Sequence, residues 1–185
     1  QSQVDDLTDY ANSVREALSS RGGTPPMYLH GHSMGGLVCS YAALRNQSMW
    51  RGLVLNSPLM GVEGGLILRM QMKVGAVLAA LAPHAKLVPA AQPSTLSQDP
   101  EVVRSYVEDP LVVQGNVRSK TAYNLLQAFQ RLEESYSLIE LPVLAIHGQE
   151  DTVCSLQAVK HFLDGLSSKD KRLVIMPGGW HELVH

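Results

Sequence analysis

The sequence is poor in cysteine and aromatic residues, and neither sign of charge dominates it. Two cysteines, Cys39 and Cys154, lie far apart, in a spacing typical neither of a metal site nor of a disulfide-built secreted scaffold. We therefore expect two free thiols in a reduced compartment. The 15 basic and 17 acidic residues are well mixed and give a net charge of -2. This balance offers no basic surface for the phosphates of a nucleic acid.

Long apolar segments are also missing. No uncharged apolar run reaches about 18 residues, and the N-terminus shows no basic start followed by an apolar stretch. Neither a membrane span nor a signal peptide is predicted, and we expect a cytoplasmic or peripheral membrane protein. The chain begins at Gln1 rather than Met and enters a helical pattern almost at once. We interpret it as a piece of something longer.

Hydrophobic side chains make up 45% of the 185 residues, which is enough for the core of one domain. Apolar spacing of three and four residues predicts helices over 4–18, 37–44 and 156–166, the first of them capped by Ser2. Short apolar runs predict strands at 27–29, 52–56, 143–146 and 173–176. Continuous apolar runs are typical of parallel strands buried on both faces. The predicted class is α/β, with a parallel sheet covered by helices.

Residues 59–139 interrupt this alternation and are predicted to form a helical cap inserted between core segments 1–58 and 140–185. Asp99 and Ser119 are predicted to cap two of its helices, and no strand is expected. A third helix, over 66–81, is apolar on nearly every side. It either packs in the core or faces lipid and substrate.

The chemistry begins at Gly31-His32-Ser33-Met34-Gly35, a G-x-S-x-G motif between a predicted strand and a predicted helix. A nucleophilic serine must project from a tight turn, and the flanking glycines let strand and helix approach each other. We assign Ser33 as the nucleophile and the N–H of Met34 as an oxyanion donor.

A serine nucleophile needs a base and an acid that orients it. Asp151 and His181 follow the strands at 143–146 and 173–176, which gives the chain order Ser, Asp, His expected for this fold. The alternatives are less favourable. Glu150 would point the other way on its loop, Asp164 lies inside a helix, and His185 is a weaker base candidate. His147 and His32 are interpreted as structural.

The last five residues, from His181 to His185, also spell H-E-x-x-H, a zinc-protease signature. Such a site needs both histidines on one helix face and a third ligand. No further ligand follows His185 in this sequence, and the triad already accounts for His181. We therefore expect no metal.

Several segments together resemble the monoacylglycerol lipase family of α/β hydrolases, which also includes lysophospholipase-like enzymes. They are L-H-G-H-S-M-G-G, L-V-L-N-S-P-L, E-D-P-L, H-G-Q-E-D-T-V-C and P-G-G-W-H-E-L. The resemblance implies cleavage of a single-chain lipid ester through an acyl-serine intermediate, without a cofactor. It also implies a cap that touches membranes. The substrate pocket is assigned to Leu59, Leu66, Met70 and Cys154.

The sequence departs from this family at both ends. The family's N-terminal part, which contains its H-G-x-G oxyanion loop, and its last helix are absent, so we expect activity of the full-length parent, and the activity of this fragment is an open question. Two alternatives stay open. One is another esterase or a serine aminopeptidase-like enzyme of the same fold, and the other is a truncated, non-catalytic interaction protein.

Overall fold

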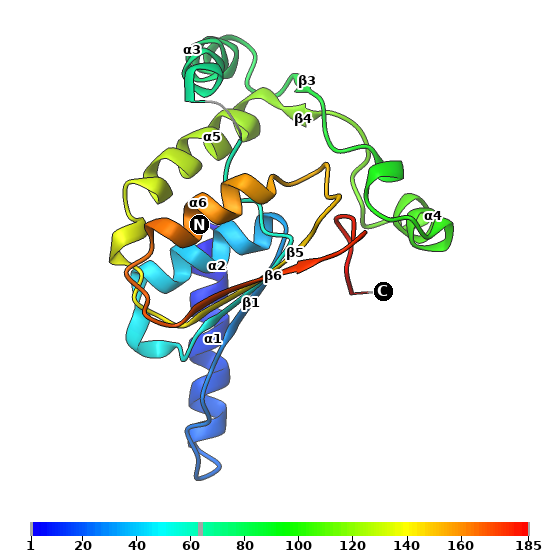
Figure 1. Ribbon diagram of the computed structural model, residues 1–185. Helices are drawn as coiled ribbons and strands as arrows, with labels where there is room; N and C mark the ends of the chain where they lie inside the picture. Colours follow the sequence, from blue (N-terminus) through cyan, green and yellow to red (C-terminus); the bar gives the residue numbers. More distant parts are fainter. Residues whose placement is uncertain (1, 63–64, 185) are drawn as a thin grey trace.

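A sheet of four parallel strands forms the centre of the molecule (Figure 1). The computed structural model describes residues 2–62 and 65–184, and side chains except those of residues 65–72. In spatial order the strands are β1 (Leu29–His32), β2 (Leu53–Asn56), β5 (Val143–Gly148) and β6 (Lys171–Met176).

The strands are in parallel register, with Leu53 of β2 opposite both Leu29 of β1 and Val143 of β5. Helix α2 (Met34–Arg45) connects β1 to β2, and α6 (Leu156–Gly165) connects β5 to β6. All carboxyl ends of the strands therefore lie at the same edge of the sheet, where α/β folds gather their functional groups. The predicted α/β class is confirmed.

The first strand differs from its prediction. It covers Leu29–His32 rather than 27–29, and the N–H of Leu29 donates to the carbonyl of Gly52. The ladder continues until the N–H of Ser33 donates to the carbonyl of Asn56. Gly31 and His32 break the apolar pattern in the sequence, but the neighbouring strand still supplies their hydrogen bonds. The strand thus ends directly before Ser33.

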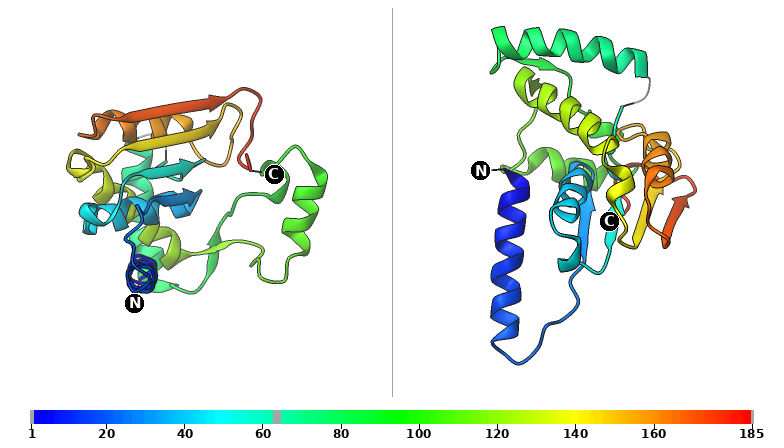
Figure 2. Two further views of the ribbon diagram at one scale, coloured as in Figure 1. Left: turned by 90° about the horizontal axis from the view of Figure 1, so that it is seen from below. Right: turned by 90° about the vertical axis from the view of Figure 1, so that its left-hand side faces the viewer.

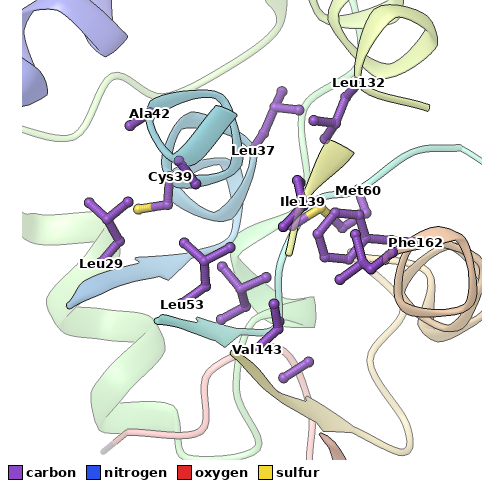
Figure 3. Close-up of a cluster of buried hydrophobic side chains, with 14 of the residues drawn as sticks. Leu29, Leu37, Cys39, Ala42, Leu53, Met60, Leu132, Ile139, Val143 and Phe162 are labelled. Carbon is purple, nitrogen blue, oxygen red and sulfur yellow. The ribbon is translucent and has the colours of Figure 1, made fainter. Parts of the chain in front are cut away.

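The core lies between the sheet and helices α2, α5 (Ser119–Glu133) and α6 (Figure 3). Leu55 and Ala145 are opposite each other on β2 and β5, and both are completely buried. Leu132 from α5 and Phe162 from α6 are also completely buried. Burying a side chain of this size contributes about 1.5–3 kcal/mol. The core therefore anchors both the strands and the helices that carry the site.

Helix α1 (Gln3–Ser19) begins at the cap that the sequence predicts. The Ser2 hydroxyl accepts from the N–H of Asp5, and the Asp5 carboxylate accepts from the N–H of Ser2. Asp5 also forms an ion pair with Arg45 at the end of α2, with an N–O distance of 2.6 Å. The capping box and the ion pair position α1 beside α2.

The segment between β2 and β5 forms a layer above the sheet edge (Figure 2). It contains α3 (Gly65–Leu81) and α4 (Pro100–Glu108), besides α5. Single 3-10 turns cover η1 (Gln47–Met49), η2 (Pro93–Thr95) and η3 (Tyr136–Leu138), of which the last two belong to this segment. Helix α3 packs against α5, which in turn contacts the core through Phe129 and Leu132. The helices described here include none with the length and apolar character needed to cross a bilayer.

Two details of this segment differ from expectation. It contains a small antiparallel sheet of β3 (Lys86–Val88) and β4 (Val117–Arg118), so the prediction of no strand is wrong. Strands of two and three residues are too short to give an alternating pattern. Asp99 caps α4 as predicted, but Ser119 is the first residue of α5 rather than its cap. Its hydroxyl donates to the carbonyl of Ala85 instead.

Candidate active site

Ser33 occupies a strained turn between β1 and α2. Its backbone angles are φ 52° and ψ -125°, a region that residues other than glycine rarely adopt. The Ser33 N–H donates to Asn56, and the Ser33 carbonyl accepts from the N–H groups of Gly36 and Leu59 at 3.0 and 2.9 Å. These bonds hold the serine backbone from both sides. Met34 begins α2, so its N–H is among the helix donors without an intrahelical acceptor.

Two glycines are required for this turn. A β-carbon at Gly31 would lie 2.5 Å from the carbonyl oxygen of Gly35, and one at Gly36 would lie 2.5 Å from the β-carbon of Pro58. A β-carbon at Gly35 would meet nothing within 4 Å. The close approach predicted for Gly31 is confirmed, but the second close approach involves Gly36 rather than Gly35. The sequence reasoning missed Gly36, because only the fold brings Pro58 against it.

Asp151 lies on the loop after β5, and its carboxylate is completely buried. One oxygen, Oδ1, accepts from the N–H groups of Val153 and Cys154 at 2.8 and 2.9 Å. The other, Oδ2, lies 2.9 Å from Nδ1 of His181. Burial by itself raises the pKa of Asp151, but the hydrogen bonds from His181 and the backbone N–H groups outweigh it and lower that pKa. The carboxylate is therefore ionised and oriented.

The other acid candidates lie elsewhere. The side chain of Glu150 is exposed on the same loop, and Asp164 is exposed on α6. Of the three acids weighed in the sequence, only Asp151 meets His181 in the described structure.

His181 lies on the loop after β6, and only 3% of its surface is exposed. This loop is held against the acid loop, since the N–H of Glu150 donates to the carbonyl of Gly179 at 2.9 Å. Nε2 of His32 lies 3.4 Å from the carbonyl of His181, and the two rings are 4.8 Å apart. Because Nδ1 of His181 is engaged by Asp151, its Nε2 is the ring atom left for proton transfer.

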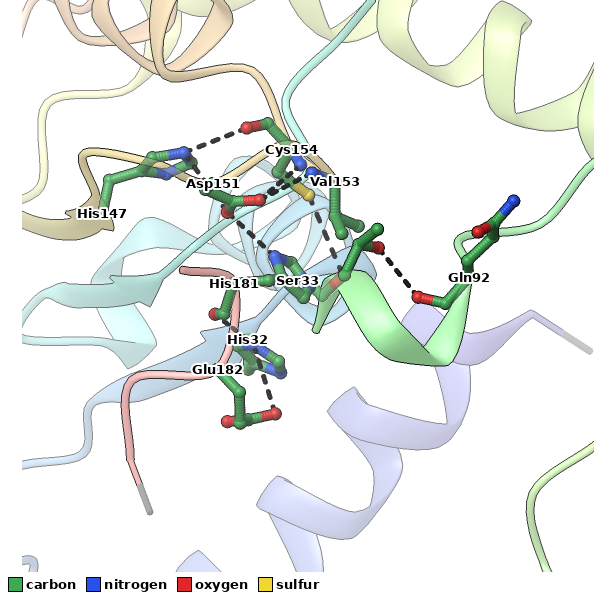
Figure 4. Close-up of polar contacts among 10 residues, drawn as sticks. His32, Ser33, Gln92, His147, Asp151, Val153, Cys154, His181 and Glu182 are labelled. Atoms are coloured by element: carbon green, nitrogen blue, oxygen red, sulfur yellow. Dashed lines mark hydrogen bonds and ion pairs between the residues drawn. The ribbon is translucent and has the colours of Figure 1, made fainter. Parts of the chain in front are cut away.

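Ser33, Cys154, Asp151 and His181 form one cluster at the edge of the sheet (Figure 4). The Ser33 hydroxyl lies 4.0 Å from the Cys154 sulfur, and one polar atom each of Asp151, Cys154 and His181 lies within 4.8 Å of the others. The contacts of the described residues include no hydrogen bond between Ser33 and His181. Catalytic hydrogen bonds are often long without substrate and tighten when it binds.

The four residues assigned to the substrate pocket fall into two groups. Cys154 is buried beside the Ser33 hydroxyl, and half-buried Leu59 is bonded through its N–H to the Ser33 carbonyl. Leu66 and Met70 belong to α3, and their side chains lie outside the described part of the structure. Both assignments stay predictions.

A cleft of about 370 Å³ adjoins the acid loop. Its lining consists of Thr95, Gln149, Glu150, Asp151, Thr152 and Trp180. The cleft contains neither Ser33 nor His181.

The zinc interpretation of H-E-x-x-H finds no helix to support it. Residues 181–184 are not helical, and His185 lies outside the described residues. Asp151, Cys154 and His181 are near enough to share a cation. However, burial, followed by the Asp151 charge, raises the pKa of the Cys154 thiol to about 12, so this ligand is protonated and weak. The Asp151–His181 hydrogen bond already uses the other two groups.

A strained serine between a strand and a helix, with an acid and a histidine after later parallel strands, places the chain in the α/β-hydrolase class. Of the residues that build the site, Gly36 could be found only from the fold. The chain belongs to the family described as serine aminopeptidase, S33, which matches residues 1–185.

Individual relatives agree with the resemblance seen in the sequence. The chain is 29% identical over 184 residues to the monoacylglycerol lipase of Mycolicibacterium smegmatis and 28% identical over 180 residues to the monoglyceride lipase of Rattus norvegicus. These alignments cover 97% of this chain but 65% and 58% of the two relatives. The crystal structure of Paleococcus ferrophilus monoacylglycerol lipase matches with a TM-score of 0.77 at 25% identity, over 98% of this chain and 68% of that one.

Proposed function

We propose that this chain carries the catalytic centre of a serine ester hydrolase, with Ser33 as nucleophile, His181 as base and Asp151 as the orienting acid. The observation that carries the proposal is the 2.9 Å hydrogen bond from His181 to a buried, ionised Asp151 beside the strained Ser33 turn. A carboxylate in this position holds one imidazole tautomer and stabilises the imidazolium that forms during the reaction.

The proposed reaction has two steps. His181 Nε2 takes the Ser33 proton while Oγ attacks the ester carbonyl, and the Met34 N–H stabilises the oxyanion. The leaving alcohol departs with that proton, which leaves an acyl-Ser33 ester. His181 then takes a proton from water, the resulting hydroxide attacks the acyl carbon, and the proton returns to Ser33 as the fatty acid leaves.

The proposed substrate is a monoacylglycerol or a lysophospholipid, which each carry one acyl chain. The two lipase relatives support this class, and we propose that Cys154 and Leu59, which both contact Ser33, face the acyl chain. The family description favours one alternative, an aminopeptidase with the same triad. Rates on a long-chain monoacylglycerol, a short ester and an aminoacyl amide separate the two.

Reaction with a fluorophosphonate probe tests the triad directly. Intact-mass analysis should show one adduct on the wild-type chain and none on Ser33→Ala. Ser40→Ala is a matched control, because Ser40 is buried within α2 and its hydroxyl donates to the carbonyl of Gly36 at 2.9 Å. Absence of an adduct on the wild-type chain, or an adduct retained in Ser33→Ala, would contradict the proposal.

We further propose that α3 brings the protein into peripheral contact with a lipid surface. Val74, Val77 and Leu81 follow each other at helical spacing and are 59%, 56% and 81% exposed. An exposed apolar stripe of this kind can bury itself at the headgroup boundary of a bilayer. The proposal supplies a route by which a monoacylglycerol reaches the site.

Sedimentation with phosphatidylcholine vesicles tests this contact. Leu81→Ser should reduce the bound fraction, because it removes the most exposed side chain of the stripe. Leu111→Ser is the matched control, since Leu111 follows α4 and is 89% exposed away from the stripe. Equal binding of both variants and the wild type would refute the proposed contact.

A further inference from the structure

The histidine of the proposed triad must cross most of the sheet to reach the nucleophile. Ser33 follows β1 and His181 follows β6, and these strands are the two edges of the four-stranded sheet, with β2 and β5 between them. The histidine loop is bonded to the neighbouring acid loop through the N–H of Glu150 and the carbonyl of Gly179. That bond places His181 relative to Asp151, but it does not place His181 relative to Ser33.

His32 connects the two edges directly. It precedes Ser33 at the end of β1, and its Nε2 lies 3.4 Å from the carbonyl oxygen of His181 (Figure 4). Because a carbonyl oxygen can only accept, the ring donates through Nε2–H. The carboxylate of Glu182 is 3.9 Å from the same nitrogen, too far for a hydrogen bond. The donated bond therefore joins the residue next to the nucleophile to the main chain of the base itself.

The rings of His32 and His181 also pack against each other. Their centroids are 4.8 Å apart and their planes are inclined by 42°, within the range of aromatic pairs. The side chain of His32 is 31% exposed, whereas His181 is almost completely buried. The ring of His32 thus restricts the rotation of the His181 ring, while its N–H holds the His181 backbone. Both contacts act on the same residue.

We propose that His32 is a positioning residue, which holds the backbone of His181 at a fixed distance from Ser33 and so keeps the base within reach of the nucleophile. The described contacts include no hydrogen bond between Ser33 and His181, so the bond from His32 ties the strained serine turn to the base. The kinetic part of this inference rests on the proposed hydrolase function, whereas the position of the histidine loop can be measured on the folded chain alone.

Two substitutions separate the Nε2 donor from the ring. His32→Phe keeps an aromatic ring against His181 and removes the donor, while His32→Gln supplies an amide N–H at the same number of bonds from the backbone. His30→Phe is the matched control, because His30 lies two residues earlier on β1 and is exposed. Circular dichroism compares the fold of each variant with that of the wild type. Should His32→Phe fail to fold, the smaller His32→Leu replaces it, because it also removes the donor.

Two readouts follow the base and its loop. Fluorophosphonate labelling at increasing probe concentration separates the dissociation constant of the probe from the maximal labelling rate. In His32→Phe the maximal rate should fall by about 10- to 100-fold at an unchanged dissociation constant, because the base acts on the chemical step. The Glu182 N–H donates to the carbonyl of Leu96, and its hydrogen exchange should become about 2- to 10-fold faster, because the adjacent His181 loses a hydrogen bond. His32→Gln should restore both quantities, and His30→Phe should leave both at the wild-type values.

The outcomes are distinguishable. A folded His32→Phe that keeps the wild-type maximal rate or the wild-type exchange rate would overturn the positioning role, and so would a His32→Gln that behaves like His32→Phe. A wild-type chain that does not react with the probe would refute the proposed hydrolase function instead. In that case the exchange rate of the Glu182 N–H alone decides the role of His32.

Discussion

A single methyl group added at Gly148 measures how closely the acid loop and the histidine loop must approach. A β-carbon there would lie 2.7 Å from the carbonyl carbon of Gly179, and nearer still to the carbonyl oxygens of Gly179 and Trp180. Carbon atoms in ordinary contact are about 3.5–4.0 Å apart, so the histidine loop must retreat by about 1 Å. Overpacking of this kind costs about 1–3 kcal/mol of stability.

The same displacement acts on the site. It separates the N–H of Glu150 from the carbonyl of Gly179 and lengthens the 2.9 Å contact between Asp151 and His181. A misplacement of about 1 Å in a catalytic group reduces rates by about 100-fold. We therefore expect Gly148→Ala to fold with reduced stability and to label with fluorophosphonate about 100 times more slowly than the wild type.

The measurement is the second-order labelling rate constant, followed by intact mass, together with the urea unfolding curve. Gly61→Ala is the matched control, because its new β-carbon would lie 3.7 Å from the side chain of Ala158, an ordinary contact. The reasoning fails if Gly148→Ala labels within threefold of the wild type, or if Gly61→Ala loses as much activity.

Three further changes have defined outcomes. Asp151→Asn removes the charge that orients His181 and should slow labelling by about 10³- to 10⁴-fold in a stopped-flow assay. Burial lowers the pKa of His147 in the folded chain below its value in the unfolded chain. As pH drops below about 6.5, His147 is therefore protonated in the unfolded chain before it is in the folded chain, and the stability of the wild type should fall. In His147→Gln the same series of urea curves should fall less steeply between about pH 6.5 and 5. Phe162→Ala should lower the free energy of unfolding by about 3–5 kcal/mol in the same experiment, because Phe162 is completely buried.

The elements that repeat a local pattern were predictable from the sequence. The apolar runs at 143–146 and 173–176 predicted strands, since a parallel strand covered on both faces has few polar positions. Ser2 and Asp99 predicted helix starts, because each side-chain oxygen accepts from an N–H a few residues along the chain. The motif around Ser33 predicted a turn, because it lay between a predicted strand and a predicted helix.

Contacts between distant segments were not predictable in this way. A β-carbon at position 36 would collide with Pro58, and one at position 148 with the carbonyl groups of Gly179 and Trp180. The sequence alone does not show which residue a glycine contacts. His147 illustrates the same point in its chemistry. Its position at a strand end is compatible with a purely structural residue, and only the folded acid loop turns the carbonyl of Cys154 back toward Nε2 of the ring. The order of Ser, Asp and His along the chain can therefore identify three residues that meet, but the donors that share the acid follow from how the loop closes.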